Sequence, residues 1–198
     1  TKSMSNQLTR PIAEVIEANI ESFKAQCYEL YKPPHLGSLV KAGNIPVYGI
    51  VIDIITEGLD PSRPIVARGF SATTEEEIYT QNPQLMDLLC TKFRAIAVGF
   101  SRDNLLIQGY PYEPPKIHAF VHECLPDELS DLSSNPDFIH LLLQHPEVKD
   151  EILTATLISI SRQITDREKF LVRAGKTLAI ELTGQMSRLN AILRKLKQ

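Results

Sequence analysis

Residues 36–54 read L-G-S-L-V-K-A-G-N-I-P-V-Y-G-I-V-I-D-I, and this stretch decides the fold. Residues 38–41 and the nearly continuous apolar run at residues 47–55 are rich in branched side chains, as strands are. Gly37 and Gly43 bracket the first run and Gly58 follows the second, at places where a turn or bulge needs a residue without Cβ. The stretch therefore predicts two strands.

Working outward, more extended segments lie on both sides of this pair. Residues 12–18 fit a helix face as well as a strand, but Phe23, Ala25 and Cys27 alternate with polar neighbours, which favours a hairpin over residues 12–30. The remaining predicted strands are residues 93–101, 105–110 and 117–123. About six short strands in so short a segment favour a closed barrel over an open sheet, because closure removes exposed edges.

A helical insertion is predicted within the barrel at residues 74–91. Thr74 and Glu77 frame T-E-E-E, a capping box that begins a short helix. Asn82-Pro83 begins a second helix, and its buried face is expected to hold four apolar residues: Leu85, Met86, Leu88 and Leu89.

Residue usage changes near Glu123, where Gly, Pro and Val give way to Leu and Ile at helical spacing. Helices are predicted after Asn135-Pro136, over residues 147–162, and after Asp166 as far as Gly184. A last helix would carry an apolar stripe of Met186, Leu189, Leu193 and Leu196. The predicted fold is α+β: a small closed six-stranded barrel in residues 10–123 and a bundle of about three to four helices in residues 124–198.

Composition narrows the class of protein. The 198 residues are 43% hydrophobic and 23% charged, which excludes a disordered or collagen-like chain. Three cysteines without CxxC spacing favour a reduced compartment, and no apolar run reaches the roughly 18 residues of a membrane span. The first 30 residues also lack the order of a signal peptide, so a cytoplasmic protein without a membrane span is expected.

Three candidate chemical sites are weak. Gly175-Lys176-Thr177 resembles the end of a phosphate-binding loop, but Phe170 stands where that motif needs glycine and the context is a predicted helix interior. His118, His122 and Cys124 would share one strand face, with the two histidines about 13 Å apart, too far for one zinc ion. No nucleophile motif is found, so neither a catalytic residue, a metal nor a cofactor is expected.

Asp53 and two cysteines have simple structural interpretations. Asp53 is the only carboxylate in a long apolar run, and it is expected either at a barrel rim or paired with Arg68 or Arg94, with catalysis the weaker reading. Cys27 and Cys90 fall on apolar faces, which predicts buried packing residues.

Charge is segregated in the C-terminal region. Residues 123–151 carry eight acidic residues and one lysine, whereas residues 152–198 carry nine basic and three acidic residues. The C-terminal cations suit the helix dipole, and the same residues are the candidate contact for an acidic partner or for nucleic acid: Arg188, Arg194, Lys195 and Lys197.

Four segments resemble successive strands of the HAS barrel, the domain shared by HerA-type DNA-translocating ATPases and the α and β subunits of rotary ATP synthases. These are A-E-V-I-E-A at 13–18, F-K-A-Q-C-Y-E-L at 23–30, P-P-H-L-G-S-L-V-K at 33–41 and V-Y-G-I-V-I-D-I at 47–54. With T-E-E-E, P-Q-L-M-D-L-L, P-P-K-I-H-A-F-V and F-L-V-R-A-G-K added, the chain is similar to stand-alone HAS-barrel proteins of cyanobacteria.

The resemblance implies a collar-like barrel that assembles proteins and performs no chemistry, and the chain lacks the ATPase domain of the larger relatives. A non-catalytic adaptor is therefore expected, with a ring ATPase such as a HerA-like translocase as the implied partner, and self-association is an open possibility. The alternative is single-strand nucleic-acid binding, with Tyr48, Tyr110 and Tyr112 as stacking platforms. Only 11 basic against 13 acidic residues up to His122 disfavour it.

Overall fold

A computed structural model describes residues 10–197 and contains a closed antiparallel barrel. Seven strands form one sheet in the order β2-β1-β7-β3-β4-β5-β6, and pairing of β2 with β5 closes six of them. Their bounds are β1 (Ala13–Ala18), β2 (Ser22–Cys27), β3 (Leu39–Ala42), β4 (Val47–Gly58), β5 (Leu89–Arg102), β6 (Leu105–Gln108) and β7 (Phe120–Glu123). The predicted six-stranded barrel is confirmed, and β6 is an additional strand on the outer edge of β5.

The barrel interior is filled by small and medium apolar side chains around two phenylalanines, Phe23 and Phe93. Val51, Ala95 and Ala97 point inward, whereas Ile50, Ile52 and neighbouring residues of β5 belong to a second core outside the barrel. Both faces of β4 are therefore buried over residues 47–52, which explains the apolar run of that half of the strand, because strands covered on both faces lose the polar alternation.

Glycine is required at two positions of the decisive stretch. A Cβ on Gly49 would lie 2.9 Å from Ala95 Cβ and from the Phe23 ring, so the barrel wall leaves no room for one. Gly37 has a φ of +80°, and a Cβ there would lie 2.5 Å from the backbone nitrogen of Thr156 in the helical region. The absence of a side chain at Gly37 thus allows the segment just before β3 to pack directly against the backbone of α5.

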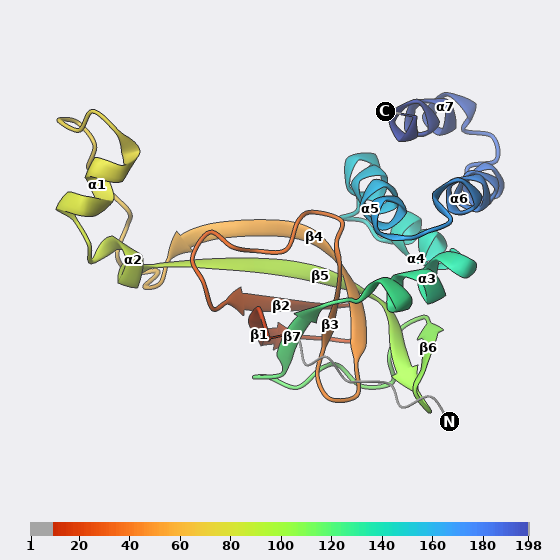
Figure 1. Cartoon of the computed structure of the whole chain (residues 1–198), viewed down its shortest axis with the longest axis horizontal. Coiled ribbons are helices and arrows are strands. Elements are labelled where there is room, and N and C mark those ends of the chain that lie inside the picture. Colours follow the sequence, from red (N-terminus) through yellow and green to blue (C-terminus); the bar gives the residue numbers. More distant parts are fainter. Residues whose placement is uncertain (1–9, 198) are drawn as a thin grey trace.

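The C-terminal region holds five helices within the described residues: α3 (Pro126–Ser134), α4 (Phe138–Gln144), α5 (Asp150–Gln163), α6 (Arg167–Glu181) and α7 (Met186–Leu196). They cover one end of the barrel, with α3 beside β6 and α4 beside β5 (Figure 1). Their buried residues form one continuous core with the outer face of β3, β4 and β5. The α+β class is confirmed; the additional helix is α3, which follows β7 almost at once.

A polar junction ties α3 to the barrel. Glu128 accepts hydrogen bonds from Lys41 Nζ at 2.8 and 2.9 Å, from Tyr48 Oη at 3.2 Å and from the backbone nitrogen of Leu125 at 2.8 Å. One carboxylate therefore caps the N-terminus of α3 and binds two barrel strands. Burial, and then the Glu128 charge, raises the pKa of Tyr48, so its hydroxyl remains a donor.

The insertion between β4 and β5 contains α1 (Glu75–Gln81) and α2 (Leu85–Leu88). It lies at the far end of the two long strands, on the opposite side of the molecule from α6 and α7 (Figure 1). Thr74 Oγ1 accepts from the backbone nitrogen of Glu77 at 3.3 Å, whereas the Glu77 carboxylate accepts from Thr73 rather than Thr74, so only half of the predicted capping box is present. The strand β5 begins at Leu89, so the helical part ends earlier than residue 91.

Two predicted apolar faces differ from those observed. Neither α1 nor α2 has a buried residue, and Met86 and Leu88 are exposed, because the insertion has no neighbour to cover them. In α7 the buried residues are Leu189, Ile192 and Leu196, whereas Met186 is exposed at the first turn. By contrast, Leu153, Leu157 and Ile160 form the predicted buried face of α5.

Candidate protein-binding surfaces

The β4–β5 arm, defined here as residues 53–89, is the most exposed part of the described chain. None of its residues is buried. Its large apolar side chains nevertheless include many that face solvent: Ile54, Ile55, Leu59, Ile65, Val66, Phe70, Met86 and Leu88. Phe70 is fully exposed. Many exposed large apolar side chains within one segment favour an interaction surface over chance exposure of single residues.

The base of the arm is firmly attached to the barrel. The ladder between β4 and β5 continues to Gly58 and Leu89, and Thr56 and Thr91 hydroxyls lie 2.9 Å apart across it. Tyr31, just after β2, contacts Tyr79 of α1 edge to face, and their hydroxyls are 2.5 Å apart. The exposed apolar residues are therefore presented by a braced hairpin.

The arm is acidic. It carries two arginines and seven acidic residues: Asp53, Glu57, Asp60, Glu75, Glu76, Glu77 and Asp87. Glu57 pairs with Lys92 at 2.8 Å, and Asp60 pairs with Arg63 at 3.4 Å. Among residues 10–197, no cation forms an ion pair with Glu75, Glu76 or Asp87, so these three keep their charge available to a partner.

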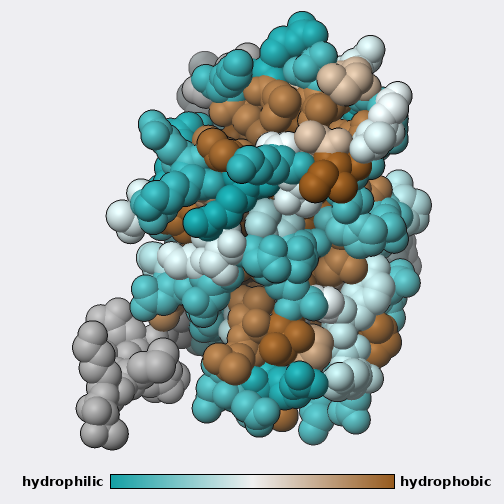
Figure 2. Space-filling view, turned by 90° about the vertical axis from the view of Figure 1, so that its right-hand side faces the viewer, coloured by the Kyte–Doolittle hydropathy of each residue, from teal (hydrophilic) through white to brown (hydrophobic). Residues whose placement is uncertain are grey.

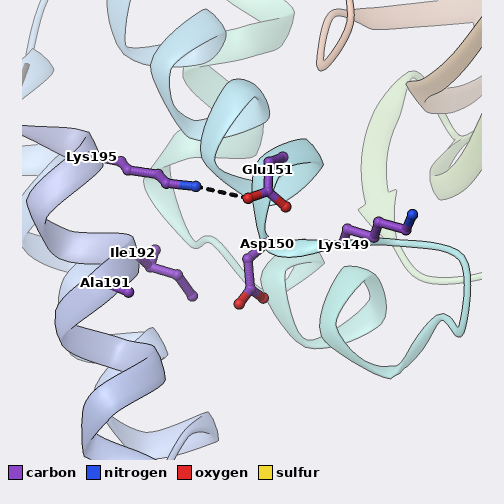
Figure 3. Close-up of a pocket in the computed structure, with 6 residues that line it drawn as sticks. All are labelled: Lys149, Asp150, Glu151, Ala191, Ile192 and Lys195. Carbon is purple, nitrogen blue, oxygen red and sulfur yellow. Dashed lines mark hydrogen bonds and ion pairs between the residues drawn. The ribbon is translucent and has the colours of Figure 1, made fainter.

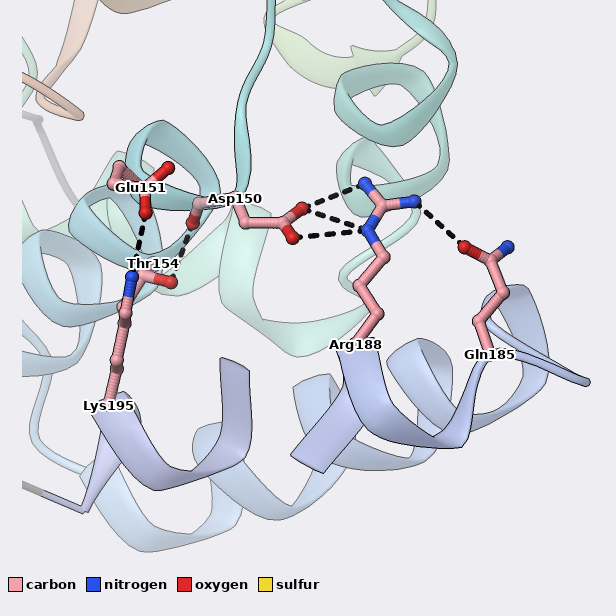
Figure 4. A network of polar contacts seen from close by, with 6 residues as sticks. All are labelled: Asp150, Glu151, Thr154, Gln185, Arg188 and Lys195. Carbon is pink, nitrogen blue, oxygen red and sulfur yellow. Dashed lines mark hydrogen bonds and ion pairs between the residues drawn. The ribbon is translucent and has the colours of Figure 1, made fainter. Parts of the chain in front are cut away.

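The structure separates the four predicted contact residues of α7 into two kinds. Arg188 donates to both oxygens of Asp150 at 2.8 to 3.1 Å and to Gln185 Oε1 at 3.2 Å, and Lys195 donates to Glu151 Oε1 at 2.9 Å (Figure 4). The hydrogen bond to Asp150 raises the pKa of Arg188. These two residues fasten α7 to the first turn of α5, so the C-terminal charge is partly neutralised within the chain.

Arg194 and Lys197 are exposed and form no ion pair with a carboxylate of the described chain. Arg162, Arg167 and Lys176 share both properties. Exposed apolar residues accompany them, namely Val172, Ile180 and Met186. The space-filling view of this end shows apolar side chains within a mainly hydrophilic surface (Figure 2). We call α6 and α7 with these residues the helical end.

An open pocket of about 410 Å³ lies between α5 and α7 (Figure 3). It is lined by Lys149, Asp150, Glu151, Ala191, Ile192 and Lys195. The Lys195–Glu151 pair spans it, and Asp150 is engaged by Arg188. Both of its carboxylates are thus engaged by cations of α7, so the pocket belongs to the attachment of α7.

A second cleft, of about 310 Å³, lies at the barrel mouth between the β1–β2 turn and the loop before α5. Asp53 lines this cleft at the barrel rim, which was one of its two predicted positions, and it lies opposite Arg94 in the β4–β5 ladder. The Arg94 guanidinium, however, forms its ion pair with Glu147, and this hydrogen bond lowers the pKa of Glu147. The pairing of Asp53 with Arg68 is not found.

His118, His122 and Cys124 do not converge. The strand β7 begins only at Phe120, and His118 lies before it with a φ of 67°, where it contacts Glu14. That contact, with a 2.8 Å hydrogen bond from Tyr28, lowers the pKa of Glu14. Among residues 10–197 no three His, Cys, Asp or Glu side chains are arranged to bind a metal ion.

The remaining candidates are structural. Gly175-Lys176-Thr177 lies inside α6, as predicted, where the backbone amides are engaged in the helix. Cys27 and Cys90 are buried as predicted, and Cys124 is buried too. Burial raises the pKa of the Cys27 thiol to about 11 and raises the pKa of the Cys124 thiol well above its ordinary value, which makes both thiols poor nucleophiles at neutral pH.

Sequence reasoning did not identify the arm as a surface. Its apolar residues at positions 85–89 were assigned to a buried face, because helical spacing reports the side of a helix and not the presence of a neighbour. The available signal was the combination of Pro61, Pro64 and Gly69 with apolar residues between them, in a segment without a predicted packing partner.

Comparison with known protein families and with curated proteins finds no match to this chain. No helix within residues 10–197 has both the length and the apolar character needed to cross a membrane.

Proposed function

We propose that this protein is a non-catalytic assembly adaptor that binds protein through the β4–β5 arm. The observation that carries the proposal is the exposure of the arm: residues 53–89 contain no buried residue and yet include many large apolar side chains that face solvent. Burial of one such side chain by a partner would contribute about 1.5–3 kcal/mol of favourable free energy to binding.

The resemblance to HAS barrels supports an assembly role and supplies the partner class. In those proteins the barrel is a collar of a ring ATPase, so a ring ATPase such as a HerA-like translocase is the proposed partner of the assembled adaptor. The helical end offers a second contact surface through Arg194 and Lys197, the two predicted contact residues that form no ion pair within residues 10–197.

The test is affinity capture from nuclease-treated native lysate with the tagged full-length chain. Phe70→Asp places a charge on the most exposed aromatic residue of the arm and is expected to abolish recovery of a stoichiometric ring-ATPase subunit. Leu105→Asp is the matched control, because Leu105 is also exposed but lies on β6, far from the arm. Equal recovery with the wild-type chain and with Phe70→Asp would contradict the proposal.

Single-strand nucleic-acid binding is the second candidate function and has less support. Tyr48 is buried and bound to Glu128, so it is not a stacking platform. Tyr110 and Tyr112 remain exposed, and the Tyr112 ring packs 5.3 Å from the Phe100 ring. Binding that occurs only without nuclease, and weakens steeply with salt, would favour this candidate.

A further inference from the structure

We propose that the β4–β5 arm of one copy docks on the helical end of a second copy, so that the protein assembles head to tail. The inference rests on the proposed assembly function and names the occupant of the arm. Its basis is the complementarity of two surfaces of the same chain, one acidic and one basic, that each combine unpaired charge with exposed apolar side chains.

The charges are complementary. The arm offers Glu75, Glu76 and Asp87, none of which forms an ion pair within the described chain. The helical end offers six exposed cations without an ion pair to a carboxylate of residues 10–197: Arg162, Arg167, Arg173, Lys176, Arg194 and Lys197. Contact between the two surfaces pairs opposite charges, whereas arm against arm would place carboxylates together.

Apolar groups are available on both sides. Ile65, Val66 and Phe70 project from the loop that precedes α1. On the helical end, Val172 and Lys176 are one turn apart on the exposed side of α6, and Ile180 lies one turn further.

The geometry makes the contact intermolecular. The arm and the helical end lie at opposite ends of the longest axis, joined by the braced β4–β5 hairpin (Figure 1). A chain therefore cannot cover its own arm with its own helical end. Because the two surfaces differ, two copies joined by one such contact leave one arm and one helical end free, so the contact either is made twice between two antiparallel copies or repeats as a ring or a filament.

The test is sedimentation velocity on the purified full-length chain over a range of protein concentrations and salt. We expect concentration-dependent association that weakens as salt rises, because exposed charge pairs are screened. Phe70→Asp is expected to weaken the association at least tenfold, since a buried aromatic anchor typically dominates an interface. A chain that stays monomeric at every concentration would overturn the inference.

A charge exchange tests the pairing itself. The arm variant Glu75→Lys/Glu76→Lys and the helical-end variant Lys176→Glu/Arg194→Glu are each expected to be monomeric. Their equimolar mixture is expected to associate, because each variant then offers a surface opposite in charge to one on the other. The control Arg102→Glu/Lys116→Glu changes exposed barrel cations and should associate as the wild type does.

Two results would contradict the pairing. If the helical-end variant alone still associates, its unchanged arm binds something other than the helical end. If the mixture stays monomeric while circular dichroism shows both variants folded, the two surfaces are not partners. The capture of a ring ATPase from lysate is measured independently of self-association. A chain that fails to self-associate but still captures the ATPase would overturn this inference and leave the adaptor function standing.

Discussion

Replacement of Glu128 by alanine should destabilise the whole protein, because this carboxylate joins α3 to the barrel. The change removes the acceptor of Lys41, of Tyr48 and of the backbone nitrogen of Leu125. A hydrogen bond to a charged group contributes about 1.5–3 kcal/mol, but the side chains of Glu128 and Lys41 are 20% and 22% exposed, so water replaces part of each bond. We expect a loss of about 2–3 kcal/mol in the free energy of unfolding.

The assay is urea and thermal unfolding followed by far-ultraviolet circular dichroism. A loss of that size lowers the melting temperature by about 5–10 °C in a chain of this length. The control is Glu113→Ala, an exposed carboxylate outside the regular elements, which should lie within about 0.5 kcal/mol of the wild type. A double-mutant cycle with Lys41→Met should give a coupling of about 1–2 kcal/mol.

The same experiment tests whether barrel and helices unfold together. Their shared core, which runs from Ile50 and Ile96 to Leu157 and Ile192, predicts a single transition. Two resolved transitions, or a Glu128→Ala variant as stable as the Glu113→Ala control, would refute the assignment of Glu128 as the junction.

Three further predictions concern single sites. Gly37→Ala should lower the melting temperature strongly, because the new Cβ would meet the backbone of Thr156 at 2.5 Å at a φ of +80°; a normal melting curve would contradict this contact. Arg188→Ala should cost about 0.5–1 kcal/mol in urea unfolding, since its pair with Asp150 is about one-third exposed, whereas Arg194→Ala should cost nothing measurable. Burial raises the pKa of Cys27 to about 11, so the thiol stabilises the fold fully below its ordinary pKa near 9 and this contribution is lost as pH rises toward 11. Unfolding midpoints measured across that range should therefore fall less steeply for Cys27→Ala than for the wild type.

Local pattern was sufficient for most of the fold. Two patterns correctly indicated strands. The alternation of Phe23, Ala25 and Cys27 belongs to a strand with one buried face, and the apolar run from Val47 belongs to a strand whose first half is buried on both faces. The helix α3 was not predicted although Pro126 and Glu128 mark its start, because Leu129 and Leu132 alone make a weak apolar period.

The candidate site was less predictable, because it depends on contacts between elements. The basic C-terminus was correctly recognised as a charged segment, but the pairing of Arg188 with Asp150 and of Lys195 with Glu151 joins residues about forty positions apart, which no local pattern reveals. The exposure of Met86 and Leu88 likewise follows from the length of β4 and β5, which carries α2 beyond the reach of the barrel core.

The length of β5 fixes how far apart the two ends of the molecule are. At about 3.3 Å per residue the 14 residues of β5 have a contour length of about 45 Å, and the part of the strand that leaves the barrel sets how far the arm lies from it. Adding two residues to both β4 and β5 would move the arm about 7 Å outward and keep every side chain on its own face, whereas adding one would turn those faces over. The distance between the arm and the barrel can therefore change only in steps of two residues if the side chains of β4 and β5 are to keep their faces.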